Sequence, residues 1–230
     1  MARFRATMSI NRFEEILLCM RFDDEATREE RRATDKLALI YQYFSLFVDN
    51  CKKNYIPNVN ITVDEQLYPW RGQAKHVKTY IPSKPDKYGL KFWVAADALN
   101  SYCINIQLYR GKENDAPERR QGPRVVNDLC SHLYNNGRNI TFDNLFTDYE
   151  LAQSLLSKNT IIIGTVRKSK PFLPKEMLPD KKREELSTIF GYNDKVTVCS
   201  YVPNNNRAVI LMSTMHQDGI VSHMNHKNLI

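Results

Sequence analysis

Two aspartates stand where strand patterns stop, and together they could hold a metal ion. In residues 137–156, GRNITFDNLFTDYELAQSLL, apolar Ile140 and Phe142 alternate with polar residues, which predicts a strand that ends at Asp143. Earlier in the chain, NVNITVDEQL predicts a short strand that ends at Asp64. Close carboxylates repel each other unless cations lie between them, and divalent cations held in this way support phosphoryl transfer. The alternative, in which Asp143 only caps a helix or shapes a turn, stays open.

The segment after Asp143 predicts a helix. Thr147 and Glu150 have the spacing of a capping box, in which the hydroxyl and the carboxylate each accept a hydrogen bond from an unpaired amide of the first turn. Three apolar residues then share one helical face: Leu151, Leu155 and Leu156. The sequence therefore predicts a strand, a turn that begins with Asp143, and a helix that packs one apolar face against the strand.

The order of the predicted elements indicates the fold class. Three strands come first, ending at Asp64 and then covering 90–99 and 102–111. A helix over 124–136, the strand that ends at Asp143, the capped helix and a strand over 160–166 follow. An antiparallel start followed by parallel crossovers is the order of an RNase H-like fold, an α/β fold with a mixed sheet. The first and fourth strands of that fold are neighbours, so the two aspartates would face each other.

The N-terminal part of the chain predicts helices. Two amphipathic helices are predicted over 10–20 and 37–48, and the charged stretch 21–35 between them is predicted to be an exposed connector. The aromatic stripe Tyr41, Phe44 and Phe47 of the second helix is predicted to lie in the core.

The C-terminal part predicts a β-rich segment. After residue 168 a basic stretch broken by prolines precedes a hairpin, with strands over 195–200 and 207–213 around the turn PNNN. We therefore expect three parts: an N-terminal helical segment (1–55), the first part of the RNase H-like core (56–168), and an inserted β-rich segment (169–230).

The composition is that of a globular protein with a basic surface. Of the 230 residues, 42% are hydrophobic, and 33 Lys and Arg outnumber 26 Asp and Glu, which gives a net charge of +7. This balance favours a polyanionic partner, with nucleic acid first. The five cysteines form no CxxC pair, which indicates reduced thiols in an intracellular protein, and the five histidines have no metal-ligand spacing. No apolar run has membrane-spanning length, and no signal peptide is recognised.

Four long motifs carry a resemblance to a known family. ITVDEQLYPWRG, YIPSKPDKYGLKFW, GRNITFDNLFTDYELAQSLL and GTVRKSK occur in the order found in the piggyBac family of transposases and the host proteins derived from them. The helical start MSINRFEEILLCMRFDD resembles the segment before the catalytic domain of that family. The resemblance implies a DDE transposase core with three catalytic aspartates and two Mg²⁺ ions, with Mn²⁺ as a substitute. It further implies DNA cleavage at transposon ends through hairpin intermediates, strand transfer into TTAA targets, a homodimer and a nuclear location.

The matching motifs transfer roles to individual residues. By this resemblance Asp64 in VDEQL is the first catalytic aspartate and Asp143 in FDNLF the second, both as metal ligands. The resemblance also implies DNA contacts at four basic positions: Arg167, Lys170, Lys84 and Lys87. For any single lysine among them, a solvated basic loop stays an open alternative. The segment 1–55 would serve dimerisation or DNA binding.

One family motif has no counterpart in the sequence. The third aspartate of the family lies in a segment resembling KGGVD, and Asp218 in HQDG does not match it. We therefore expect an incomplete core in a truncated chain that is inactive in transposition.

Three functions are weighed on these observations. The first is a transposase lineage with metal-dependent DNA cleavage. The second is a domesticated protein that binds DNA or chromatin without cutting it. The third, an unrelated RNase H-like nuclease, shares the two aspartates but leaves the long motif matches unexplained.

Overall fold

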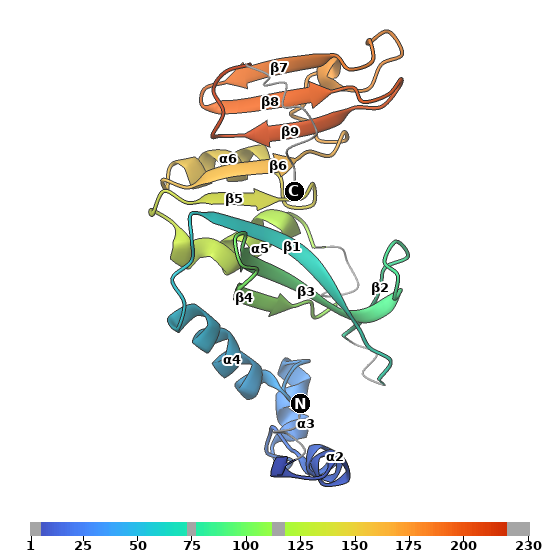
Figure 1. Ribbon diagram of the computed structural model, residues 1–230, viewed down its shortest axis with the longest axis vertical. Coiled ribbons are helices and arrows are strands. Elements are labelled where there is room, and N and C mark those ends of the chain that lie inside the picture. Colours follow the sequence, from blue (N-terminus) through green and yellow to red (C-terminus); the bar gives the residue numbers. More distant parts are fainter. Residues whose placement is uncertain (1–5, 73–76, 112–117, 220–230) are drawn as a thin grey trace.

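The computed structural model describes residues 6–72, 77–111 and 118–219, which form helices and one large sheet (Figure 1). The helices are α2 (Ile10–Cys19), α3 (Arg28–Thr34), α4 (Tyr41–Lys53), α5 (Gln121–Cys130) and α6 (Tyr149–Leu156), with short 3-10 turns η1 (Ser131–Leu133) and η2 (Lys175–Met177). The strands are β1 (Asn60–Pro69), β2 (Lys78–Tyr80), β3 (Tyr88–Asp97), β4 (Cys103–Leu108), β5 (Asn139–Phe142), β6 (Ile161–Thr165), β7 (Thr188–Asn193), β8 (Val196–Tyr201) and β9 (Val209–Ser213). None of the helices within these ranges is long and apolar enough to cross a membrane.

The strands of the described residues form a single mixed sheet. Their order is β2-β3-β1-β5-β6-β9-β8-β7, and β4 also pairs with β3. β5 lies parallel to β1 and to β6, whereas every other pair is antiparallel. The antiparallel start and the crossovers through α5 and α6 are the predicted arrangement of an RNase H-like core.

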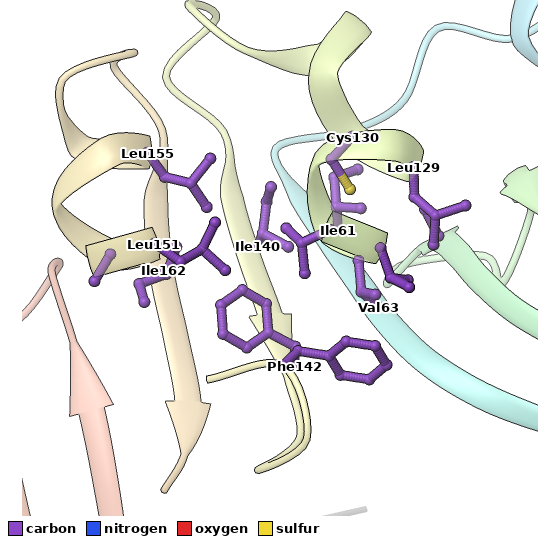
Figure 2. Packing of buried hydrophobic residues seen from close by; sticks show 14 of the residues in the cluster. Ile61, Val63, Leu129, Cys130, Ile140, Phe142, Leu151, Leu155 and Ile162 are labelled. Carbon is purple, nitrogen blue, oxygen red and sulfur yellow. The ribbon is translucent and has the colours of Figure 1, made fainter. Parts of the chain in front are cut away.

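Helices α5 and α6 cover one face of this sheet (Figure 2). The following side chains from β1, β5, β6 and the two helices meet there, and none is more than 3% exposed: Ile61, Val63, Leu129, Cys130, Ile140, Phe142, Leu151, Leu155 and Ile162. The apolar face predicted for the helix after Asp143 is confirmed for Leu151 and Leu155, while Leu156 is half-buried. Gly137, at φ +67°, adopts the left-handed conformation that lets the chain turn from η1 into β5.

A buried carboxylate ties the N-terminal segment to the sheet. Asp97, 1% exposed, accepts hydrogen bonds from the backbone amide of Asn58 at 2.7 Å and from the hydroxyl of Tyr55 at 2.9 Å. The amide of Leu99 donates to its other oxygen at 2.9 Å. These donors, led by the Asn58 amide, lower the pKa of Asp97 to about 2. The linker after α4 is thereby fixed to the end of β3.

The stretch 21–35, predicted to be an exposed connector, instead contains helix α3. Asp23 accepts hydrogen bonds from the guanidinium groups of Arg28 and Arg31, each at 3.1 Å. Opposite charges of the segment are therefore paired within it. These pairs tie the chain before α3 to two arginines of the helix.

The prediction that an aromatic stripe of the second helix lies in the core is wrong for two of its three members. Helix α4 begins at Tyr41, and Tyr41 and Phe47 are each 50% exposed. Phe44 alone of the three packs inward, with its ring 6.4 Å from that of Phe92. The helix lies next to β4 (Figure 1), and Phe44 packs with Leu108 of β4 and with Leu90 and Phe92 of β3.

The predicted C-terminal hairpin is confirmed, and it belongs to the main sheet. β8 and β9 pair in antiparallel fashion, and β9 pairs with β6, so the β-rich segment extends the sheet at that side. β2 and β7 were not predicted. β2 has only three residues, and β7 follows the basic stretch broken by prolines.

Candidate active site

The register of the sheet places Asp64 beside Asp143. The last residue pair in the parallel ladder of β1 and β5 is Val63 with Phe142, so the two aspartates come next in register. Neighbouring strands lie about 4.8 Å apart, and successive side chains point to opposite faces. Since Val63 and Phe142 are buried under the helices, both aspartates point to the other face, where they are exposed. The register therefore gives Asp64 and Asp143 the neighbouring positions that the sequence predicted.

The prediction that the first strand ends at Asp64 is wrong. β1 continues to Pro69, because β3 pairs with it as far as Gly89. Asp64 thus stands in mid-strand. It pairs with Val94 of β3 on one side, and on the other side the ladder with β5 ends one residue before it. An antiparallel partner holds its backbone in place, and the backbone amide of Glu65 donates a hydrogen bond to the Asp64 carboxylate at 2.7 Å.

Asp143 is held by its own turn and by the next strand. Its carbonyl accepts hydrogen bonds from the amides of Phe146 at 3.0 Å and Thr147 at 3.3 Å. The hydroxyl of Thr165, at the end of β6, donates to Oδ1 of Asp143 at 2.7 Å. Asp64, Asp143 and Thr165 thus form one row across three adjacent strands. Thr165 was not predicted as a site residue, although its place in β6, on the face opposite to buried Ile162 and Gly164, is the face of the site.

The predicted capping box is wrong, although the helix it was meant to start exists. The cap of α6 is Asp148, whose carboxylate accepts the amide hydrogen of Leu151 at 3.3 Å. Thr147 instead donates its hydroxyl to the carbonyl of Asp143 at 3.1 Å. Glu150 pairs with Arg120 at 2.6 Å. Thr147 therefore stabilises the turn that carries Asp143.

Two of the four predicted basic residues lie next to this turn. Arg167 donates to the side chain of Asn144 at 2.7 Å, and Lys170 lies 3.3 Å from a carboxylate oxygen of Asp148. Arg167 is exposed and Lys170 is half-buried. Lys84 and Lys87 lie in the turn between β2 and β3, at the far end of β1 and β3 from the aspartates, so the fold does not bring them to the acidic pair.

The donor atoms of the site suit a magnesium ion. Mg²⁺ in proteins commonly keeps several waters and binds through one or two carboxylates, and Asp64 and Asp143 offer such a pair on an exposed face. Within 6–72, 77–111 and 118–219, no group of three or more His, Cys, Asp or Glu side chains is arranged so that it could hold a metal ion. Of the histidines, His76, His223 and His226 lie outside those residues.

Comparisons with known proteins agree with this geometry. The family described as Transposase IS4 matches residues 1–228. The human PiggyBac transposable element-derived protein 3 is 28% identical over 169 residues, which are 71% of this chain and 28% of that protein. The cryo-EM structure of a piggyBac transposase synaptic complex with hairpin DNA aligns with a TM-score of 0.86 and 32% identity, over 94% of this chain and 45% of that one.

The chain thus spans less than half the length of each of these two relatives. The structural match confirms the RNase H-like core, and the sequence matches confirm the resemblance read from the motifs. The chain therefore belongs to the Transposase IS4 family and, within it, to the piggyBac transposases and the proteins derived from them.

Proposed function

We propose that this chain carries the metal-binding part of a piggyBac-type transposase active site, in which Asp64 and Asp143 hold Mg²⁺ or Mn²⁺ against a DNA phosphodiester. The observation that supports it most is the register of β1 and β5, which sets the two carboxylates side by side on the exposed face. A divalent cation bound there would activate the attacking oxygen and stabilise the leaving one in phosphoryl transfer.

Each side chain has a role in this proposal. Asp64 and Asp143 bind the cation, and the Thr165 hydroxyl occupies one oxygen of Asp143, which orients the other toward the site. Arg167 brings a positive charge to the edge of the site, since its guanidinium is anchored on Asn144 beside Asp143. It is placed to contact a DNA phosphate next to the reacting one. Lys170, Lys84 and Lys87 are proposed as further phosphate contacts.

Metal titration tests the proposal. Free Mn²⁺, followed by electron paramagnetic resonance, is expected to bind the parent chain, and Asp64→Asn and Asp143→Asn are each expected to abolish that binding. Asp194→Asn is the matched control, because Asp194 is exposed in the turn between β7 and β8, remote from the site in the strand order. Binding that survives in both site variants would refute the assignment. With two carboxylates we expect weak binding, and no strand transfer by this chain alone.

A second candidate function is DNA or chromatin binding without cleavage. The net charge of +7 supports it, as does the match to a human protein whose name describes it as transposable element-derived. Such binding should weaken steeply as salt rises, and it should survive the two aspartate substitutions. A salt-independent affinity would exclude it.

The family resemblance extends the proposal to finer features. We propose TTAA-containing DNA and transposon ends as targets, a homodimer of the full-length protein, and action in the nucleus, with the segment 1–55 serving dimerisation or DNA binding. Competition between a TTAA duplex and a scrambled duplex tests the first of these, and equal affinity for the two would remove it.

A further inference from the structure

Three exposed tyrosines gather at the end of the sheet beyond Asp64. Tyr68 of β1, Tyr80 of β2 and Tyr88 of β3 are 59%, 52% and 53% exposed, and they are called the tyrosine platform below. In Figure 1 this end of β1 and β3 extends with β2 away from α5 and α6. Tyr80 pairs directly with Tyr88, and Tyr68 pairs with Leu90, two residues further along β3. Because side chains alternate along a strand, all three rings share the face of Asp64.

The platform makes little use of its rings or hydroxyls within the fold. Tyr80 and Tyr88 contact each other, with ring centroids 4.8 Å apart. In the part of the chain that the structure describes, none of the three hydroxyls has a hydrogen-bond partner. Tyr55 and Tyr134, by contrast, donate their hydroxyls to side chains inside the protein, at 2.9 and 3.0 Å. The polar and aromatic surfaces of the platform therefore face solvent.

The surroundings of the platform are positively charged. Residues 66–90 contain five Lys or Arg and a single acidic residue, Asp86. The ammonium group of Lys78 lies 5.1 Å from the ring centroid of Tyr88. Lys84 and Lys87 lie in the turn that joins β2 to β3. Aromatic rings beside a basic track are the recognition elements of single-stranded nucleic acid, since bases stack on the rings while the cations follow the phosphates. A duplex hides its base faces, so the surface fits unpaired nucleotides.

The distance along β1 relates the platform to the acidic pair. Tyr68 follows Asp64 by four residues, which is about 13 Å along a strand. At about 3.4 Å per stacked nucleotide, that length corresponds to roughly four nucleotides of one strand. We propose that the tyrosine platform stacks unpaired nucleotides of a DNA strand whose phosphate lies at Asp64 and Asp143. The position of the phosphate rests on the proposed function, whereas the stacking does not.

Fluorescence anisotropy on the full chain tests this inference. An oligothymidine probe and a blunt duplex probe are titrated without metal against the parent and the double variant Tyr80→Leu/Tyr88→Leu. Loss of stacking is expected to weaken oligothymidine binding about five- to 150-fold per tyrosine and to leave duplex binding within about twofold. The double Tyr→Phe variant keeps the rings and should bind as the parent does. Tyr192→Leu is the matched control, because Tyr192 is 54% exposed on β7, the strand at the opposite edge of the sheet.

The outcomes separate this inference from the proposed function. If the leucine variant binds oligothymidine as the parent does, or loses single-strand and duplex binding to the same extent, the platform is refuted. If oligothymidine binding depends on the tyrosines while Mn²⁺ binding does not depend on Asp64 or Asp143, the platform stands and the metal site fails. A parent chain that binds no DNA of either kind overturns the platform, whatever the metal titration gives.

Discussion

Gly164 of β6 gives the sharpest test of how the turn at Asp143 is held. A Cβ added at Gly164 would lie 2.8 Å from the carbonyl oxygen of Phe142 and 2.9 Å from its ring, and closer still to the hydroxyl of Thr147. Two of these atoms belong to the backbone and core that carry Asp143, so they cannot move aside cheaply. Gly164→Ala is therefore expected to destabilise the protein in spite of the lower chain entropy of alanine.

The size of the effect follows from overpacking. Extra methyl groups in a packed core cost about 1–3 kcal/mol, and each kcal/mol lowers the melting temperature of a chain of this length by about 2–4 °C. We expect Gly164→Ala to melt about 2–12 °C below the parent in thermal unfolding followed by circular dichroism. It should also bind Mn²⁺ more weakly, because the Asp143 turn has to shift.

Gly191→Ala is the control for this substitution. Gly191 also lies in a strand, but a Cβ there would meet only the terminal methyl group of Met177, at 2.7 Å. A flexible methionine end can rotate away, so the melting temperature should stay close to that of the parent. Equal destabilisation by the two substitutions, or a Gly164→Ala chain as stable as the parent, would refute the packing argument.

Three further perturbations have defined outcomes. Because the pKa of Asp97 is lowered to about 2 from 3.8, its carboxylate stabilises the fold above pH 3.8, and this contribution is lost as the pH falls through 2. The melting temperature of the parent should fall between pH 4 and pH 2. Asp97→Asn should already melt lower at pH 7, and its melting temperature should fall less over the same pH range. An equal fall in the two proteins would contradict this. Thr165→Val should weaken Mn²⁺ binding about tenfold at an unchanged melting temperature, and unchanged affinity would remove Thr165 from the site. Leu155→Ala, in the core, should lower the free energy of unfolding in urea by about 2–5 kcal/mol, against less than about 0.5 kcal/mol for Leu99→Ala, whose side chain is 79% exposed; similar costs would contradict the assigned core.

The central part of the fold could be predicted from sequence, because periodicity and element order constrain it. The alternation of Ile140 and Phe142 and the apolar faces of α5 and α6 led to a mixed sheet with Asp64 next to Asp143. The rules of sheet topology then predicted that the strands of Asp64 and Asp143 are neighbours, which no local sequence pattern shows. The neighbouring positions of Asp64 and Asp143 were predicted in this way, from two strand positions and one fold hypothesis.

The errors arose where tertiary contacts outweigh local pattern. β1 continues past Asp64 because β3 pairs with its polar second half, and a polar stretch does not reveal that partner. Thr147 has the residue type of a helix cap, but its hydroxyl donates a hydrogen bond to the carbonyl of Asp143. Asp148 caps α6 instead. The role of Thr165 depends on the register between β5 and β6, which sequence spacing alone does not give.

The parallel pairing of β1 with β5 also determines when the acidic pair can come into existence. Contacts between β1, β3 and β4 close short loops, whereas β1 meets β5 only after three further strands and α5 have been made. Long-range parallel pairing is slow, because the entropy of closing a large loop is lost before any stabilising contact forms. During synthesis, Asp64 therefore leaves the ribosome before Asp143, and the two can meet only after β5 has been made. The proposed cation site would need β1 and β5 to be paired, so we expect the early phases of refolding to proceed at the same rate in Mn²⁺ and in a chelator.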